Sequence, residues 1–583
     1  MFRLLIVVML AAATLPAFCQ VKGMAPAVKG KQVPKKLADG RDYGRSMVIS
    51  KFGIVATSQT LASQAGADIL THGGNAIDAA IAANAALSVT EPMMNGIGGD
   101  LFAIYYEAKT GKIYGLNASG WSAKSMTLDF LKSHGITKEI PTRSIQAVTV
   151  PGAVAGWDAL HTRFGKLPLS EDLTPAVYYA VHGVPVTELV AGVWQVAEKA
   201  FANQPGFKET FLPGGHAPKT GEIFKDPDLA ASLRLVGEHG RDGFYRGPLA
   251  EKLVAFLKEQ GSLLREDDFA DFQPEWVEPI STTYHGWSVY ELPPNGQGIA
   301  ALSMLNIMEQ FPLAEFGHNS AKALHVMIEA KKLAYADLAK YVGDPRFSKI
   351  PVEQLLSKDL AKRRAALINP ARAACHVEPS QVAEHMAKIG RDTTYLSVID
   401  QDGNIASLIQ SNFAAFGTGY VAPGTGFALQ NRGALFNLDP GTPDVIAPRK
   451  RPLHTIIPGF MKKGDVEIGF GIMGGFNQAQ AHAQFVANLV DYGMNIQAAL
   501  SAARFTKPTF EGCDVEIEAR VPQPVLQQLT AWGHQLKVLN DYSMSMGRGN
   551  VVMLNGQGTK FGASDPRADG EAIPQSPPWR LSK

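Results

Sequence analysis

Two adjacent threonines stand at the head of a predicted β-hairpin, in the run RDTTYLSVIDQDGNIASLIQS at 391–411. A hydroxyl is a weak nucleophile until a base removes its proton, and the α-amine of an N-terminal threonine is one such base. Thr393 would acquire that amine if the chain were cut after Asp392. The competing interpretation is that both threonines simply begin a strand, which suits their shape. In either case Thr394 should point to the opposite face, because strand side chains alternate.

A second candidate feature is the glycine-rich run GFGIMGG (469–475), which follows a predicted strand and precedes a predicted helix. Its GxGxxG spacing is that of a dinucleotide-binding turn. The acid that should end a second strand, Asp491, here closes a helix, which argues against that site. The run instead places Gly474 and Gly475 at a helix N-terminus, where backbone N–H groups can stabilise an oxyanion. His454, in KRPLHTIIP, lies between the hairpin and these glycines, although a lone histidine beside an apolar run is usually a core residue.

The remaining motif content and the charge argue against several functional classes. The sequence has no HExxH, CxxC, P-loop or Gly-x-Ser-x-Gly motif, and its fourteen histidines are scattered. We therefore predict neither a metal nor an organic cofactor, since nucleophile, base and oxyanion donors can all come from the chain. Lys plus Arg number 55 against 54 Asp plus Glu, and no basic run is interleaved with aromatics. A nucleic-acid partner is thus not expected.

Alternating strands and helices must position these residues. From Met47 the chain reads as a strand, then an Ala-rich helical region at 61–89 broken by HGGN, then two strands around a KTGK turn. Residues from about 170 to 362 are mainly helical by periodicity. The polar segment at 362–392 has few apolar anchors, and we expect an exposed, mobile linker of the kind that chain cleavage favours.

The first twenty residues, MFRLLIVVMLAAATLPAFCQ, have the basic residue, apolar stretch and small residues of a secretory signal. The apolar stretch is too short for a membrane span, so none is expected after signal removal. We predict a signal peptide at 1–19, a flexible leader at 20–45, and a periplasmic or secreted protein. Cys375 and Cys513 would then remain, and that compartment permits a disulfide between them.

An ordered series of short motifs resembles the γ-glutamyltransferase (glutathione hydrolase) family of N-terminal nucleophile hydrolases, over about residues 48–570. Any one motif is weak, whereas the series in this order is specific. The matching stretches are GGNAIDAAIAANAALSVTEPMMNGIGGDLF, VPGAVAGW, ELPPNGQG, YADLAKYVGDP, TTYLSVIDQDGN, FGTG, KRPLHTIIP, GGFNQAQ, DYGMNIQAALSAARF and GASDPR.

The resemblance implies an α+β fold, a four-layer αββα sandwich made as one precursor. The precursor would cut itself between Asp392 and Thr393. The large chain (46–392) and the small catalytic chain (393–583) would stay together as a heterodimer within one intertwined domain.

The resemblance also implies roles for four residues. Thr393 would attack an amide carbonyl of a small-molecule substrate, and water or an amine would then take the acyl group. Gly474 and Gly475 would stabilise the oxyanion. Ser411 stands eighteen residues after Thr393, where the family usually has a threonine that hydrogen-bonds the nucleophile.

Substrate-recognition positions depart from the family pattern. The strand that usually supplies an arginine for the glutamyl carboxylate reads YGLNASGWSA, without arginine. Phe413 occupies the position of an ammonium-binding asparagine, and Asn412 should face the other side of the strand. Ala434 and Leu435 replace an acidic pair. A zwitterionic glutamyl head would therefore lack both its cationic and its anionic partners.

The residues left for substrate binding are Asn431, Arg432, His454 and Thr455, the last two in place of the family's serine pair. Arg432 and His454 can hold a carboxylate by a different route, which is our hypothesis for this branch. Three functions then stay open. The default is a hydrolase or transferase of γ-glutamyl amides such as glutathione, and the alternative is an acylase or amidase for other acyl groups. The third, a non-catalytic secreted binding protein, does not explain why the cleaving residues are retained.

Overall fold

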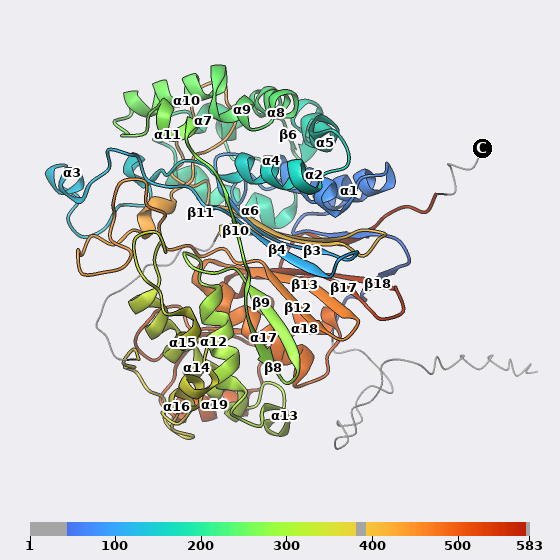
Figure 1. Cartoon of the computed structure of the whole chain (residues 1–583), viewed down its shortest axis with the longest axis vertical. Helices are drawn as coiled ribbons and strands as arrows, with labels where there is room; N and C mark the ends of the chain where they lie inside the picture. The colour runs from blue at the N-terminus through green and yellow to red at the C-terminus, as the bar shows by residue number, and fades with distance from the viewer. Residues whose placement is uncertain (1–42, 381–391, 579–583) are drawn as a thin grey trace, which may run out of the picture. The chain divides into compact units, whose positions relative to one another are not determined.

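The computed structural model describes residues 43–380 and 392–578 (Figure 1). The predicted signal peptide and nearly all of the predicted leader lie outside the described residues. Within the described ranges no helix is both long and apolar enough to cross a membrane.

Two seven-stranded antiparallel sheets form the centre of the molecule. Each sheet combines strands that precede Thr393 with strands that follow it. The first sheet has the order β19 (Ala572–Pro574), β2 (Ile54–Ala56), β10 (Asp392–Ile399), β11 (Ile405–Phe413), β3 (Asp100–Glu107), β4 (Lys112–Ala118), β7 (Glu275–Val277). The second has the order β1 (Val48–Ser50), β18 (Lys560–Ser564), β17 (Arg548–Leu554), β13 (Val466–Met473), β12 (Gly459–Lys463), β9 (Trp287–Glu291), β8 (Ile280–Tyr284).

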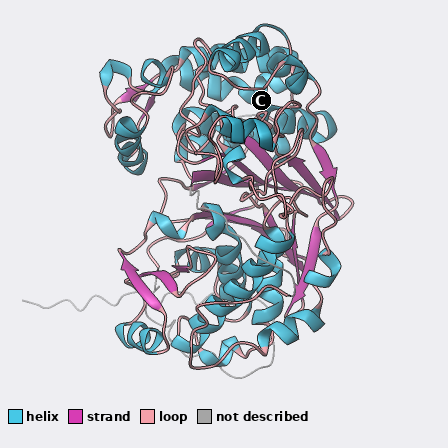
Figure 2. Ribbon diagram, turned by 90° about the vertical axis from the view of Figure 1, so that its left-hand side faces the viewer, coloured by secondary structure: helices cyan, strands magenta, loops and turns pink. Residues whose placement is uncertain are grey.

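Helices cover the outer face of each sheet, so the molecule has four layers (Figure 2). On the first sheet lie α1 (Thr60–Thr71), α2 (Ala76–Thr90) and α4 (Ala153–Phe164), with α5 (Leu169–His182) and α8 (Pro227–His239) packed on them. On the second lie α12 (Gly298–Met308) and α17 (Gln478–Val490), with α14 (Ala321–Tyr341) behind α12. Every residue of α2 is buried, as expected for a helix that is apolar all round. The predicted αββα sandwich is confirmed.

Strand alternation separates the cores. On β10, Tyr395 and Ile399 belong to the cluster between the two sheets, whereas Leu396 and Val398 belong to the cluster under the helices. A strand with apolar residues on both faces is what a sheet buried on both sides requires. The predicted hairpin is confirmed as β10 and β11, and HGGN does separate two helices, α1 and α2.

The segment before the predicted cut is exposed for the most part but anchored, contrary to our expectation of a loose linker. Cys375 forms a disulfide with Cys513, and the Gly512 N–H donates to the Cys375 carbonyl at 2.7 Å. Further on, the Ser380 N–H and hydroxyl both donate to Asp337 Oδ1, at 2.6 and 2.9 Å. Such partners lie far away in sequence, so a local polar pattern does not reveal them. Residues 381–391 of this segment lie outside the described residues.

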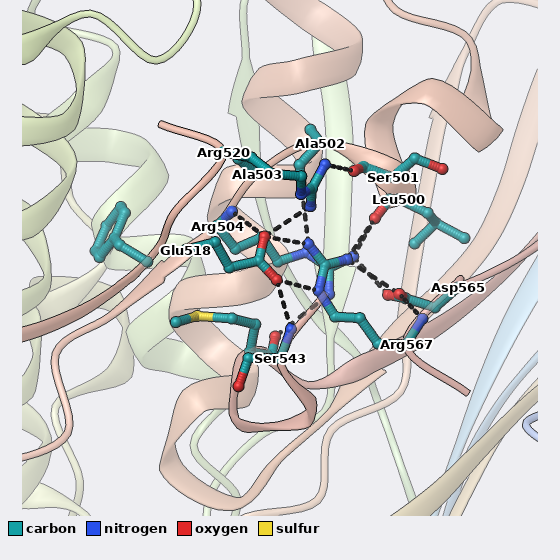
Figure 3. Close-up of polar contacts among 12 residues, drawn as sticks. Leu500, Ser501, Ala502, Ala503, Arg504, Glu518, Arg520, Ser543, Asp565 and Arg567 are labelled. Carbon is teal, nitrogen blue, oxygen red and sulfur yellow. Dashed lines mark hydrogen bonds and ion pairs between the residues drawn. The ribbon is translucent and has the colours of Figure 1, made fainter. Parts of the chain in front are cut away.

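A buried cluster of charged groups ties together the segments around β15 (Asp514–Glu518) and β18 (Figure 3). Arg567 uses all three guanidinium nitrogens. Its Nε donates to Glu518 Oε1 at 2.7 Å, and its Nη2 donates to Glu518 Oε2 at 2.6 Å. Its Nη1 donates to Asp565 Oδ1 and to the Leu500 carbonyl, both at 3.0 Å. Arg504 makes a further bond to Asp565 at 2.7 Å, so both acids are multiply paired.

Candidate active site

Thr393 is buried on the inter-sheet side of β10, because it shares the strand parity of Tyr395 and Ile399. Thr394 has the opposite parity, which places its side chain toward the helices, as predicted. Its hydroxyl has no hydrogen-bond partner in the described part of the chain. Only the first of the two threonines therefore enters the layer between the sheets.

A β-bulge places Ser411 beside Thr393. From Ile399 back to Thr394, β10 pairs with β11 without interruption. Between the Thr394–Gln410 pair and the Asp392–Phe413 pair, β10 has one residue, Thr393, and β11 has two, Ser411 and Asn412. Bulges re-aim side chains and are frequent next to active sites. The Thr393 hydroxyl donates to Ser411 Oγ at 3.0 Å, and the Phe413 N–H donates to the same oxygen at 2.8 Å. Ser411 thus makes the hydrogen bond to Thr393 that we expected, and the catalytic roles of both residues stay predictions.

The second sheet brings the glycine turn to this point. Ser397 Oγ donates to the Gly469 carbonyl at 3.0 Å. Two residues further along both strands, a Cβ at Gly471 would lie only 2.4 Å from the Tyr395 ring. The same spacing would bring Met473, the last residue of β13, to the level of Thr393, and the glycine turn follows Met473 in the chain.

Gly474 and Gly475 form that turn, with φ angles of 142° and 59° that favour glycine. The turn opens the short helical segment Gly475–Asn477, which continues into α17. Across residues 43–380 and 392–578, neither glycine N–H has a hydrogen-bond partner. Both donors are therefore available to a developing oxyanion.

Gln297, which lies in the motif ELPPNGQG, joins the glycine turn to the segment that carries Thr455. Its side-chain amide donates to the Thr455 carbonyl at 2.5 Å and to the Gly475 carbonyl at 2.8 Å. The Tyr335 hydroxyl donates to the Phe476 carbonyl on the same turn. Our sequence reading gave neither Gln297 nor Tyr335 a role, and membership of a motif was the only signal for them.

Arg432 contacts the ring of Phe413, the residue whose N–H donates to Ser411. Its Nη1 donates to Thr455 Oγ1 at 2.7 Å, and its guanidinium carbon lies 4.6 Å from the centre of the Phe413 ring. Its Nε and Nη2 are buried and have no hydrogen-bond partner among the residues that the structure describes. Burial lowers the pKa of Arg432 to about 9, against the opposing effect of Asp100. Phe413 itself has a positive φ of 77°, which is rare for a bulky residue.

Asp100 and His454 form a fully buried pair, of which the sequence analysis named only His454. His454 Nε2 donates to Asp100 Oδ2 at 2.9 Å, while the Ile456 N–H approaches His454 Nδ1 at 3.4 Å. Asp100 Oδ1 accepts from the Gly120 N–H at 2.9 Å and from the Gln430 amide at 2.8 Å. Burial raises the pKa of Asp100 to about 7, and burial together with nearby arginines lowers the pKa of His454. A neutral histidine beside a carboxylate fits these contacts.

Asn431 holds a neighbouring loop. Its side-chain amide donates to the carbonyls of Thr142 and Gly417, both at 2.9 Å, and its oxygen accepts from the Ala414 N–H at 3.0 Å. The structure thus joins Thr393, Ser411, Arg432, Thr455 and the glycine turn through continuous contacts, with His454 behind Arg432. The substrate-binding roles of Asn431, Arg432, His454 and Thr455 stay predictions.

Two groups of side chains in the described ranges have the composition of a metal site, and both lie away from Thr393. They are His325, Glu329 and His534, and Asp78, His161 and Asp172. In the first, Lys332 already pairs with Glu329 at 2.6 Å. In the second, His161 Nε2 contacts the Leu167 carbonyl at 2.7 Å. Neither group is connected to the nucleophile.

Comparisons with known proteins agree with this geometry. The family model described as gamma-glutamyltranspeptidase matches residues 62–575. The chain belongs to the gamma-glutamyltranspeptidase family. It is a family hydrolase, and it contains no described helix that could span a membrane.

Named relatives include both hydrolases and acylases. The glutathione hydrolase-like YwrD proenzyme of Bacillus subtilis is 38% identical over 90% of this chain and 99% of its own. The oxamate amidohydrolase proenzyme of Klebsiella pneumoniae is 34% identical over 90% and 98%. The crystal structure of cephalosporin acylase from Bacillus halodurans matches with a TM-score of 0.85 and 43% identity, covering 92% of this chain and 98% of that one. The family is thus shown, whereas the relatives differ in the substrates that name them.

Proposed function

We propose that this chain is an exported, self-processing amide hydrolase that uses Thr393 as an N-terminal nucleophile and acts on acyl amides other than γ-glutamyl amides. The observation that carries the reaction type is the 3.0 Å hydrogen bond from the Thr393 hydroxyl to Ser411 Oγ at the buried end of β10. It is supported by the N–H groups of Gly474 and Gly475, which have no hydrogen-bond partner among the described residues. Conversion of a proenzyme is supported by the relatives, whose names describe proenzymes.

Processing needs only groups near Thr393. Its Oγ1 attacks the carbonyl carbon of Asp392, and the peptide C–N bond breaks as the nitrogen takes a proton. The resulting ester is hydrolysed by water, which leaves a carboxylate on Asp392 and a free α-amine on Thr393. That amine is the base that the hydroxyl lacked in the precursor.

Catalysis repeats the attack on a substrate. The α-amine accepts the proton of Oγ1 as the oxygen adds to the amide carbonyl carbon, and Gly474 and Gly475 donate to the oxyanion. The C–N bond breaks, and the leaving amine takes the proton from the α-ammonium group. Water, or an amine, then attacks the ester carbonyl, returns a proton to Oγ1 and releases the acyl group.

The surroundings of Arg432 favour the acylase alternative over γ-glutamyl amides. A glutamyl head carries an ammonium group, which needs acceptors or a carboxylate. Phe413, Ala434 and Leu435 offer none at the positions where the family usually has them. Oxamate, which names one relative, is an amide whose acyl group carries no ammonium. A glutathione hydrolase-like name for another relative keeps the glutamyl class as the competing outcome.

Export is supported by the bond between Cys375 and Cys513, because disulfides persist mainly outside the cytosol. After a cut before Thr393 this bond would join the two chains covalently. Intact masses with and without reductant would then differ, with one species before reduction and two after it.

The decisive experiment compares Thr393→Ala with Thr394→Ala. We expect the Thr393 variant to remain one chain, and the Thr394 variant to be cut like the native protein, because its hydroxyl lies on the other face. Intact mass after reduction reads this out, and the small chain should begin at Thr393. Two cut variants, or an uncut native protein, would contradict the proposal.

A further inference from the structure

We propose that Asp78, His161 and Asp172 bind a divalent transition-metal ion in the helical layer that covers the first sheet. Asp78 lies on α2, His161 on α4 and Asp172 in the first turn of α5. α2 packs against both of the other helices (Figure 1), so a shared ion would hold the three together. The inference does not depend on the proposed function. Our expectation that no metal is needed concerned the reaction at Thr393 and is not affected.

The first observation is the carboxylate of Asp172, whose side chain is completely buried. Neither of its two oxygens has a hydrogen-bond partner among the residues that the structure describes. Burying a carboxylate is costly unless the charge is paired and hydrogen-bonded, and each such group in a native structure calls for an explanation. A bound cation would supply the partner that both oxygens lack.

The second observation concerns charge. Asp78 is a second buried carboxylate beside Asp172. Burial, together with the charges of Asp78 and Glu171, raises the pKa of Asp172 to about 9. Within residues 43–380 and 392–578 no lysine or arginine side chain forms an ion pair with either acid, and His161 is the base nearest to Asp172. Two neighbouring buried carboxylates without a cationic side chain need either a proton or a metal ion.

The distances favour an ion over a shared proton. His161 Nε2 lies 3.9 Å from Asp172 Oδ2, beyond the roughly 3.2 Å that an N–H···O hydrogen bond spans. Two metal–ligand bonds of about 2.0–2.2 Å each span up to about 4.3 Å, so one ion can contact both atoms. One ligand atom from each of the three side chains lies within 4.8 Å of the other two. The third ligand, from Asp78, is therefore within reach of the same ion.

The loop between α4 and α5 supplies the remaining contacts. The Leu167 carbonyl lies 2.7 Å from His161 Nε2. With the imidazole hydrogen on Nδ1, Nε2 offers a lone pair and this carbonyl is a further oxygen ligand. The Lys166 N–H donates to Asp78 Oδ1 at 2.9 Å, and the Asn75 N–H donates to Oδ2 at 2.8 Å. Hydrogen bonds of this kind orient metal ligands, and the 22% exposed side chain of His161 gives an ion access from solvent.

The other group with the composition of a metal site provides a contrast. Beside His325 and His534, the ammonium group of Lys332 already lies 2.6 Å from Glu329 and takes the place of a cation. In the group of Asp78, His161 and Asp172 the described residues supply no such ammonium. An imidazole nitrogen with carboxylate oxygens suits Zn²⁺, whereas Ca²⁺ takes about six to eight oxygen ligands. Zn²⁺ is therefore the probe of choice.

Calorimetric titration of the chelator-treated native protein with Zn²⁺ tests the inference. We expect one tight site per chain, and both Asp172→Asn and His161→Gln should weaken it by at least about 100-fold, the upper range for losing a group that only orients a ligand. Glu171→Gln is the matched control, because it removes the same charge from the neighbouring, exposed position. Its affinity for Zn²⁺ should equal that of the native protein.

Thermal unfolding separates a metal site from a merely structural role of the same residues. Zn²⁺ should raise the Tm of the native protein and of Glu171→Gln, but not that of Asp172→Asn. If Asp172→Asn does not fold, the affinity of His161→Gln decides, since that side chain is partly exposed. Native-like zinc affinity in the Asp172 and His161 variants, no tight site in the native protein, or tighter binding of Ca²⁺ than of Zn²⁺ would overturn the inference.

Discussion

Arg567 and Arg432 are both completely buried arginines near acidic groups, yet the chain treats them differently. Arg567 donates from all three guanidinium nitrogens to two carboxylates and to backbone carbonyls (Figure 3). Arg432 donates from a single nitrogen to a hydroxyl, and its other two nitrogens have no partner within residues 43–380 and 392–578. The protein supplies acceptors for all three guanidinium nitrogens of Arg567 but, among the described residues, for only one of Arg432.

The pKa shifts of the surrounding groups reflect this difference. Arginine neighbours lower the pKa of Glu518 and of Asp565 below their usual values in spite of burial. Beside Arg432, burial prevails, so the pKa of Asp100 is raised to about 7 and that of Arg432 is lowered to about 9. A buried ion needs direct, well-oriented partners to stay charged without cost. The comparison suggests that an incomplete set of partners marks the place where a ligand completes it.

The largest expected effect is on stability at Arg567. Arg567→Met should lower the free energy of unfolding by roughly 3–5 kcal/mol, because it removes one of the cationic partners of each buried carboxylate, Glu518 and Asp565. Urea unfolding in a Thr393→Ala background, which keeps the chain uncut, measures this. A loss of unfolding free energy below about 1 kcal/mol would contradict our expectation that Arg567 matters more for stability than Arg432.

The next prediction uses pH to separate the two regions. Glu518 and Asp565 have lowered pKa values in the folded protein. Their contribution to the free energy of unfolding is therefore present above about pH 4.5 and is lost as the pH falls through these lowered pKa values. Asp100 has a raised pKa in the folded protein. Its contribution to the free energy of unfolding is therefore present below about pH 4 and is lost as the pH rises through about 7. Urea midpoints between pH 3 and 8 should show Glu518→Gln flattening the acid side and Asp100→Asn flattening the slope between pH 4 and 7. Identical changes in both variants would contradict these assignments.

The smallest expected effect is on stability at Arg432. Arg432→Met should change the free energy of unfolding by less than about 1 kcal/mol, or even raise it, because the substitution removes two unpartnered donors and fills similar volume. The same urea series measures it beside Arg567→Met. A loss as large as that at Arg567 would mean that Arg432 supports the fold.

How far the sequence could lead differed between the fold and the pocket. The hairpin, the interrupted helix pair and the placement of Thr393 opposite Thr394 follow from local alternation and glycine positions, which a sequence displays directly. Asp100, Gln297 and the Cys375–Cys513 bond depend on residues brought together over 138 to 354 positions, so no local pattern contains them. For Asn431 the structure adds contacts that the sequence does not display. Its amide bonds a neighbouring loop, and its predicted role in substrate binding stays a prediction.

The interleaving of strands in both sheets determines how the two chains of the proposed mature enzyme are held together. In the first sheet, β10 and β11 lie between β2 and β3, and in the second, β18, β17, β13 and β12 lie between β1 and β9, so each sheet contains strands of both chains. Separating the two chains would break strand pairs in both sheets and expose the core between the sheets. Their association is therefore not an equilibrium that dilution can shift, and a dissociation constant would have no practical meaning. One translation product gives one enzyme, with a stoichiometry that is fixed before the cut is made.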